Sequence, residues 1–208
     1  MDISLIQQGL KRPLPGVSSH LKMAPAHREA EFRGIRAEDF NPRLSAVLVL
    51  LFQEHERLKI VFIRRGEYVG IHSGQIAFPG GRYEEEDGDL LTTAKREVEE
   101  EIGIHRDSYE IIGQLTDLYV PPSNFLVRAF VAYSPIRPDY TPDPREVQEV
   151  IEVDLDHFLN HEHIKIKDFP AHNSLNNTSA PYYDVDGIVI WGATAMMLRE
   201  MMDTIINN

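Results

Sequence analysis

The stretch GGRYEEEDGDLLTTAKREVEEEIGI, residues 80–104, places four glutamates close together near its end. They are Glu97, Glu99, Glu100 and Glu101. Like charges three or four residues apart in a helix destabilise that helix by roughly 0.2–0.5 kcal/mol per pair. The stretch therefore raises the question of what offsets the repulsion.

An apolar repeat in the same stretch predicts that these glutamates lie on one helix. The residues that recur at spacings of three, four and four are Leu91, Ala94, Val98 and Ile102. This spacing is typical of an amphipathic helix. We expect the helix to run from about residue 89 to residue 102 and to end at Gly103.

The helical period places three of the glutamates on one side of this helix. At roughly 100° per residue, Glu97, Glu100 and Glu101 fall within an arc of roughly 100°, and Glu99 points the other way. Carboxylates in the last turn also oppose the helix macrodipole by roughly 0.3–1 kcal/mol each. Arg96, four residues before Glu100, relieves only part of this cost. Because the ligands are oxygens and the chain has no cysteine, we expect Mg²⁺ or Mn²⁺ to supply the missing positive charge.

A bare run of glutamates is more often a solvated helix face, and the residues around it favour a different interpretation. FPGG ends a short strand at residues 78–81, an acidic stretch follows, and REVEEEIGI closes the helix at residues 96–104. This arrangement resembles the signature of the Nudix hydrolases. The residues that match its second half are Arg96, Glu97, Val98, Glu100, Glu101, Gly103 and Ile104. The sequence departs from the general pattern in a spacer that is one residue longer, and in Asp87 at the early acidic position.

Two further stretches resemble the coenzyme A pyrophosphatase branch of that family. They are GQIAFPGG at residues 74–81 and IWGATA at residues 190–195. That branch usually has an arginine, then a serine or alanine, then a basic residue four positions further on. Arg65 fills the first of these positions, whereas Gly66 and Gly70 fill the other two.

The resemblance implies a pyrophosphohydrolase that cleaves the diphosphate between a nucleoside and another moiety, with coenzyme A or a derivative as the expected substrate. It implies that Glu97 and Glu101 bind the metal, that Glu100 shares this role, and that the Gly80 carbonyl completes the ligand set. Arg96 is expected to hold the carboxylates in position. Alternatives are another nucleotide substrate (a nucleotide sugar, a dinucleoside polyphosphate or an oxidised nucleotide) and a non-catalytic nucleotide sensor.

Nudix sites commonly recruit one more glutamate from a segment after the central strands, as metal ligand or general base. Here the segment is DPREVQEVIEVDL, residues 143–155, which contains Glu146, Glu149 and Glu152. The alternation of the strand turns Glu152 away from the core. We expect Glu146 to take the role, because it precedes the strand in a segment that contains prolines, and we keep Glu149 as the alternative.

The expected substrate contacts lie around the glycine-rich loop. They are Arg65, His72, Gly80 and Gly81. For His72, packing in a turn is the alternative. The segment from Tyr119 to Phe125 is expected either to position the moiety beyond the diphosphate or to form a rigid turn between strands. Residues 171–183, rich in Asn and Ser, are expected to form a mobile loop or lid.

The fold class expected is α/β, a Nudix-type α/β/α sandwich with a mixed β-sheet. Runs of strand length at residues 45–52, 59–65, 74–78, 109–117, 125–133, 149–155 and 187–191 surround the signature helix. The last run leads into a helix whose apolar face is Ala195, Leu198, Met202 and Ile205. We expect an N-terminal extension over residues 1–41, a short helix followed by a wrapping arm, and a Nudix domain over residues 42–208.

Composition limits the partners and the compartment. With 208 residues, 42% of them apolar, the chain suits one globular domain. A net charge of −12 argues against binding nucleic acid. The start of the chain lacks the pattern of a signal peptide, and the apolar runs are too short to span a membrane. We expect a cytoplasmic protein that binds a small nucleoside diphosphate derivative, and the sequence leaves a homodimer open.

Overall fold

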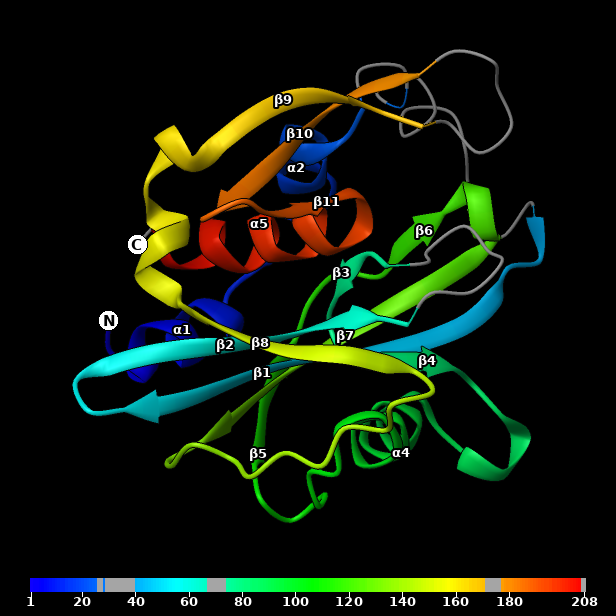
Figure 1. Ribbon diagram of the computed structural model, residues 1–208, viewed down its shortest axis with the longest axis vertical. Coiled ribbons are helices and arrows are strands. Elements are labelled where there is room, and N and C mark those ends of the chain that lie inside the picture. Colours follow the sequence, from blue (N-terminus) through cyan, green and yellow to red (C-terminus); the bar gives the residue numbers. More distant parts are fainter. Residues whose placement is uncertain (26–27, 29–39, 67–73, 171–176, 207–208) are drawn as a thin grey trace.

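Eight strands form one mixed sheet with helices on both faces (Figure 1). The computed structural model of the chain describes residues 1–25, 28, 40–66, 74–170 and 177–206. Within these ranges the strands of the sheet are β1 (Arg43–Glu54), β2 (Arg57–Arg65), β3 (Ile76–Ala77), β4 (Gly80–Arg82), β5 (Glu110–Gln114), β6 (Leu118–Val120), β7 (Phe125–Ser134) and β8 (Val147–Asp154). The predicted α/β class with a mixed sheet is confirmed.

The centre of the sheet is a parallel pair, β1 and β7, with residues 43–52 opposite residues 125–134. The strand order is β3-β2-β1-β7-β5, and β4, β6 and β8 pair with β1, β7 and β2 respectively. All pairs other than β1 with β7 are antiparallel. Because alternate residues of a strand face opposite ways, the continuous apolar run of β1 supplies two cores. Leu48 and Leu50 face one core, and Val49 and Leu51 face the other.

The helix α4 (Leu90–Ile102) covers the first core, as predicted. It begins after Asp89, whose carboxylate accepts a hydrogen bond from the Thr92 N–H at 2.7 Å. It ends at Gly103, which has φ +70° and is the left-handed residue that commonly closes a helix. Ala94 and Val98 are fully buried against β1 and β2.

A second layer covers the opposite core (Figure 1). It contains α1 (Ile3–Leu10), α2 (Val17–His20), α5 (Gly192–Ile206) and a three-stranded sheet of β9 (Ile164–Phe169), β10 (Thr178–Val185) and β11 (Ile188–Trp191). As predicted, β11 leads directly into α5. Short 3-10 helices complete the described elements: η1 (Leu21–Met23), η3 (Glu85–Asp87), η4 (Pro121–Ser123), η5 (Leu155–Leu159) and η6 (His161–His163).

One prediction about this second layer was wrong and another was incomplete. Residues 178–183, expected in a mobile loop, belong to β10 and pair with β9 and β11. The remainder of that expected loop, residues 171–176, lies outside the described residues. The apolar face predicted for α5 is buried, and residues 194–205 are buried on all sides because α1, α2, β10 and β11 also pack on this helix.

The N-terminal segment packs on α5 through both apolar and polar groups. Ile6 and Met23 are fully buried. The His20 imidazole lies 2.8 Å from the Glu200 carboxylate, and the Lys22 ammonium lies 2.7 Å from Asp203. The predicted short helix is thus present. The first part of the arm predicted to follow it contains α2 and η1, residues 26–27 and 29–39 lie outside the described residues, and the division at residue 42 stays a prediction.

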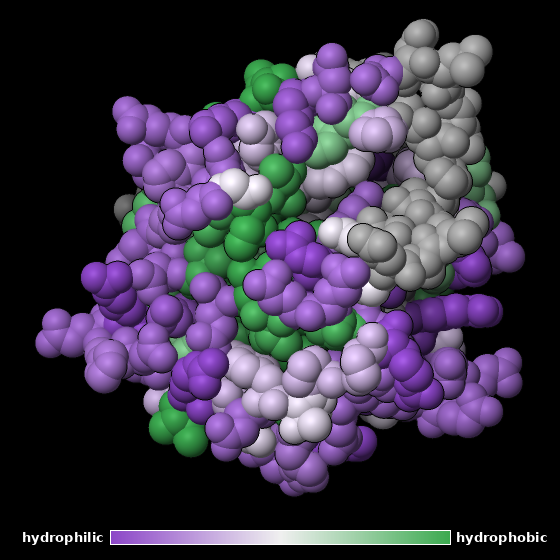
Figure 2. Space-filling view, viewed as in Figure 1, coloured by the Kyte–Doolittle hydropathy of each residue, from purple (hydrophilic) through white to green (hydrophobic). Residues whose placement is uncertain are grey.

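The surface of the molecule is predominantly polar on the face shown in Figure 2, with hydrophobic groups gathered near its centre. Among the described helices, none is both long enough and apolar enough to cross a membrane.

Candidate active site

Two adjacent glycines on β4 allow the signature helix to approach the sheet closely. Gly80 has φ +150°, and a Cβ there would overlap the Ala46 carbonyl oxygen of β1. A Cβ on Gly81 would overlap the Glu97 carboxylate. Any larger residue at these positions would displace either the strand pairing or the Glu97 side chain.

Glu101 is the most deeply buried carboxylate of the site. Its side chain is 1% exposed, and one carboxylate oxygen accepts a hydrogen bond from the Gly80 N–H at 2.8 Å. The other oxygen lies 3.4 Å from the Arg65 guanidinium. Burial raises the pKa of Glu101 to about 8, although the Arg65 charge and the Gly80 N–H act in the opposite direction.

Arg96 joins the acidic loop to the helix. Its guanidinium donates to both carboxylate oxygens of Asp87, at 2.7 and 3.1 Å, and to Glu97 and Glu100 at 3.0 and 2.8 Å. These hydrogen bonds hold the pKa of Asp87 well below its usual range. The contact of Arg96 with Glu100 follows from helical spacing, whereas the hydrogen bonds between Arg96 and Asp87 were not predicted from the sequence. The position of Asp87 at the early acidic residue of the signature could have indicated them.

Glu97 is strongly affected by neighbouring charges. Its side chain is 13% exposed, and burial raises its pKa; Arg96 opposes this shift, and the charges of Glu100 and Glu146 add to it. Glu99 lies on another side of the helix, as predicted, and pairs with Arg106 at 2.8 Å.

Of the three glutamates weighed in the segment after the central strands, Glu146 acts electrostatically on the helix carboxylates. Its charge contributes to the raised pKa of both Glu97 and Glu101. Glu149 instead pairs with Arg64 at 3.1 Å, and Glu152 pairs with Arg137 at 2.8 Å. The backbone of Glu146 is held by the Gly66 N–H, which donates to its carbonyl oxygen at 2.7 Å.

The donor set fits a hard divalent cation. In the described ranges, no three acidic or imidazole side chains already stand in the arrangement of a metal site, and Arg96 occupies the space between carboxylates. Burial and, to a smaller extent, the charges of neighbouring glutamates raise the pKa of Glu97 and of Glu101, and a cation bound beside them would favour their ionised forms. Carboxylate oxygens of this kind are the ligands that Mg²⁺ and Mn²⁺ prefer.

The expected substrate contacts are placed only in part. Arg65 ends β2 and lies beside Glu101, and Gly80 and Gly81 line the turn below Glu97. His72, and Gly70 with it, lie outside the described residues. The segment from Tyr119 to Phe125 is a turn between β6 and β7 that contains η4, which matches the expected rigid turn.

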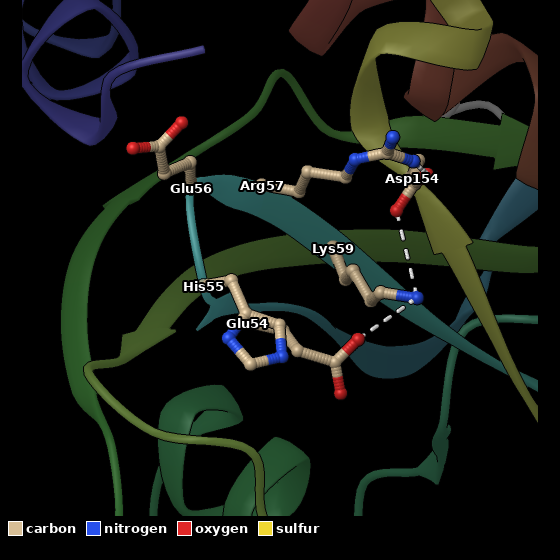
Figure 3. Close-up of a pocket in the computed structure, with 6 residues that line it drawn as sticks. All are labelled: Glu54, His55, Glu56, Arg57, Lys59 and Asp154. Carbon is tan, nitrogen blue, oxygen red and sulfur yellow. Dashed lines mark hydrogen bonds and ion pairs between the residues drawn. The ribbon is translucent and has the colours of Figure 1, made fainter.

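A hollow at the β1–β2 hairpin lies far from these carboxylates (Figure 3). It is lined by Glu54, His55, Glu56, Arg57, Lys59 and Asp154. Glu54 is eight residues along β1 from Ala46, the partner of Gly81, which corresponds to roughly 26 Å at a rise of about 3.3 Å per residue. Lys59 pairs with Glu54 at 3.2 Å and with Asp154 at 3.5 Å, so the hollow is a cluster of surface ion pairs.

Comparisons with known proteins agree with this geometry. A family model described as NUDIX domain matches residues 42–175. The chain is 31% identical to "Nudix hydrolase 22, chloroplastic" of Arabidopsis thaliana, over 76% of this chain and 54% of that protein. It is 28% identical to "Uncharacterized Nudix hydrolase NudL" of Photorhabdus laumondii, over 80% of this chain and 86% of that protein.

The lengths and the fold can also be compared. The chain spans about half the length of three plant and fission-yeast relatives that it matches, at 54%, 56% and 44%. The crystal structure of a MutT/nudix family protein from Enterococcus faecalis superposes with a TM-score of 0.51 at 12% identity, covering 100% of this chain and 76% of that one. At this identity the likeness concerns the fold alone.

Proposed function

The chain belongs to the Nudix hydrolase family, and from that premise we propose that it uses Mg²⁺ or Mn²⁺ to hydrolyse the diphosphate of coenzyme A or a close derivative. The observation that carries the proposal is the placement of Glu97 and Glu101 against the Gly80–Gly81 turn, with Arg65 beside them. This arrangement puts buried negative charge where a cation can join an acidic protein to a polyanionic substrate.

Four groups would hold the cation: the carboxylates of Glu97 and Glu101, the carboxylate of Glu100 in a shared role, and the Gly80 carbonyl. When bound, the ion would neutralise charge on the phosphoryl oxygens and lower the pKa of a bound water. Arg96 is a positioning residue, because it fixes Glu97 and Glu100 through hydrogen bonds of 3.0 and 2.8 Å.

The remaining chemistry belongs to the chain's own side chains. Glu146, whose charge acts on both Glu97 and Glu101, is the proposed general base that takes a proton from the attacking water. Arg65 would meet the phosphoryl oxygens at the end of β2. Water would add to one phosphorus and the bridging P–O bond would break, giving 4′-phosphopantetheine and adenosine 3′,5′-bisphosphate from coenzyme A.

A specific observation supports a second candidate, a nucleoside diphosphate derivative other than coenzyme A. Gly66 stands where the coenzyme A pyrophosphatase branch has serine or alanine. A Cβ at this position would lie 3.1 Å from the Arg145 carbonyl oxygen and 3.3 Å from that of Glu146. A larger residue would press on the backbone that carries Glu146, so a serine or alanine here would require that backbone to shift slightly. A site with glycine at this position would bind the phosphates of its substrate differently from the coenzyme A branch. A non-catalytic sensor is disfavoured, because a mere binder has no reason to keep the cost of clustered carboxylates.

The test is a panel of diphosphate substrates incubated with Mg²⁺, with products identified by mass. We expect coenzyme A to give the two products above, with a higher kcat/KM than nucleotide sugars or dinucleoside polyphosphates. Inert coenzyme A with turnover of another substrate would move the assignment to the second candidate, and no turnover at all would favour a sensor. A cytoplasmic location, the lack of nucleic-acid and membrane partners, and a homodimer stay predictions from the sequence.

A further inference from the structure

Four apolar or aromatic residues, two exposed and two half-buried, form a patch on the α4 side of the main sheet, outside both cores. The rings of Phe40 and Tyr119 stack with their centroids 5.7 Å apart and their planes at 23°. Leu44 and Leu126 lie beside each other on β1 and β7. Phe40 is 49% exposed and Leu44 is 39% exposed, and none of the four residues belongs to either hydrophobic core. We call this group, Phe40, Leu44, Tyr119 and Leu126, the aromatic shelf.

Hydrogen bonds hold the Tyr119 ring and the backbone of both aromatic residues of the shelf. The Tyr119 hydroxyl donates to the side-chain oxygen of Asn124 at 3.0 Å. The amide nitrogen of Asn124 donates to the Phe40 carbonyl oxygen at 3.4 Å. Arg28 donates to the Tyr119 carbonyl oxygen at 3.2 Å. The ring pair is therefore held ready for a ligand, which lowers the entropy lost on binding.

Sheet register makes the shelf continuous with the candidate active site. Ala46 lies opposite Gly81 and faces the α4 core, so Leu44, two residues earlier on β1, faces the same way. Leu44 is opposite Leu126, which in turn is opposite Tyr119. One strand spacing and two residue rises place Leu44 roughly 8 Å from Gly81, the glycine against which the Glu97 carboxylate lies. Two further strand spacings, across β7 to β6, place Tyr119 roughly 16 Å from Gly81, so the ribose and the diphosphate would have to span this distance.

We propose that the aromatic shelf binds the base of the substrate nucleotide, which stacks on the open side of the Phe40–Tyr119 pair. This inference rests on the proposed function, because it takes the diphosphate to lie at Glu97 and Glu101. A nucleobase is planar and has a π-face on each side, so it gains stacking energy from an aromatic pair. A flexible chain, such as the pantetheine of coenzyme A, has no planar face to stack. The moiety beyond the diphosphate then extends away from the shelf, toward Arg65.

The first test measures binding without turnover. Adenosine 5′-monophosphate and ribose 5-phosphate share a phosphate and differ in the base, so the ratio of their Kd values isolates the base. We expect the wild-type chain to prefer the nucleotide, and Phe40→Ala to reduce its affinity for the nucleotide about 5- to 100-fold while leaving ribose 5-phosphate unchanged. Tyr119→Leu, which keeps an apolar side chain in place, should act in the same direction.

Controls and kinetics separate this proposal from the proposed function. Ile136→Ala changes an apolar side chain that is 70% exposed outside the shelf, and should leave the Kd ratio as in the wild type. With a hydrolysed substrate, Phe40→Ala should raise KM with kcat nearly unchanged, because stacking on a distant base acts on ground state and transition state alike. Retained thermal midpoints will show that the variants fold.

Each outcome bears on one claim. An unchanged Kd ratio in both shelf variants would overturn the base site, as would a wild-type chain that shows no preference for the nucleotide. A loss of affinity for 4′-phosphopantetheine alone would also overturn it and would assign the shelf to the other moiety. If no diphosphate is hydrolysed yet the nucleotide preference depends on Phe40, the base site stands and the proposed function fails.

Discussion

Arg96 offsets part of the repulsion within a cluster of carboxylates. Glu97 and Glu100 lie in the last turns of α4, where like-charge pairs cost roughly 0.2–0.5 kcal/mol and opposition to the macrodipole adds roughly 0.3–1 kcal/mol each. The guanidinium of Arg96 bonds to both, and also to Asp87 in η3. Asp87 in turn accepts from the Thr93 hydroxyl at 2.8 Å, so the arginine is fixed from the side opposite the glutamates.

Asp87→Asn should destabilise the protein by about 1–3 kcal/mol at pH 7, the typical worth of hydrogen bonds to charged groups. Arg96 holds the folded-state pKa of Asp87 below that of the unfolded chain. The stabilisation is therefore fully present above about pH 4, the ordinary aspartate pKa, and is lost as the pH falls further. Denaturant unfolding at pH 7 and at pH 3 should show the difference between wild type and variant shrinking at the lower pH. Asp139→Asn, at an exposed aspartate, is the control, and a difference that grows on acidification would contradict this account.

Glu146→Gln tests the proposed general base. We expect kcat to fall by roughly 10²–10⁴, the usual contribution of a positioned base, with little change in the thermal midpoint. Glu149→Gln is the matched control from the same segment, because Glu149 pairs with Arg64. Near-normal turnover in the first variant together with loss in the second would transfer the role to Glu149.

At the scale of elements, α4 and β4 define the site together. The glutamates of α4 can lie against the sheet only because β4 offers glycine at residues 80 and 81, where any Cβ would overlap backbone or carboxylate. The helix thus carries its excess charge next to a strand turn that donates the Gly80 N–H to Glu101. In the proposed function, a divalent cation bound there would offset that charge.

Mg²⁺ should therefore raise the thermal midpoint of the protein, by about 5–10 °C at a concentration near 100 times its Kd. Glu101→Gln should abolish this response. Without metal it should leave the protein equally or more stable, because glutamine can still accept from Gly80 and has no carboxyl group whose ionisation burial opposes. Glu99→Gln is the control on the same helix, since Glu99 pairs with Arg106 away from the site, and its response should match the wild type. A metal-free Glu101→Gln protein that is clearly less stable than the metal-free wild type would contradict this account of the carboxylate cluster.

Local patterns predicted α4 well and β9 and β10 poorly. The helix carries its own period, its glycine end and its charge pattern, so its bounds and the direction of Glu99 could be predicted from the sequence alone. The strand β10 pairs with β9 and β11, its neighbours along the chain, and β9 lacks the pattern of a buried strand because it exposes Ile166 at 72%. The contact of Arg65 with Glu101 could not be predicted from local patterns either, because it depends on how β2 and α4 lie relative to each other in the fold.

At the scale of the whole molecule, the N-terminal segment belongs to the second layer of the fold. Periodicity predicted one apolar face for α5 but could not show that Glu200 and Asp203 are also buried, because their partners lie about 180 residues earlier in the chain. Glu200 also accepts hydrogen bonds from the Thr116 backbone, just before β6, at 3.2 Å. The N-terminal segment, α5 and the loop that leads to the aromatic shelf thus meet at one buried carboxylate.

Breaking this junction should affect stability more than chemistry. His20→Ala removes the imidazole that lies 2.8 Å from Glu200 and leaves a fully buried carboxylate with one partner fewer, so we expect the free energy of unfolding to fall by about 1–3 kcal/mol. For a chain of this length, each kcal/mol corresponds to a thermal midpoint lower by about 2–4 °C. His55→Asn, at an exposed hairpin position with φ +53° that asparagine tolerates, should change the midpoint little. If His20→Ala were as stable as His55→Asn, the contact between His20 and Glu200 would carry no stability of its own.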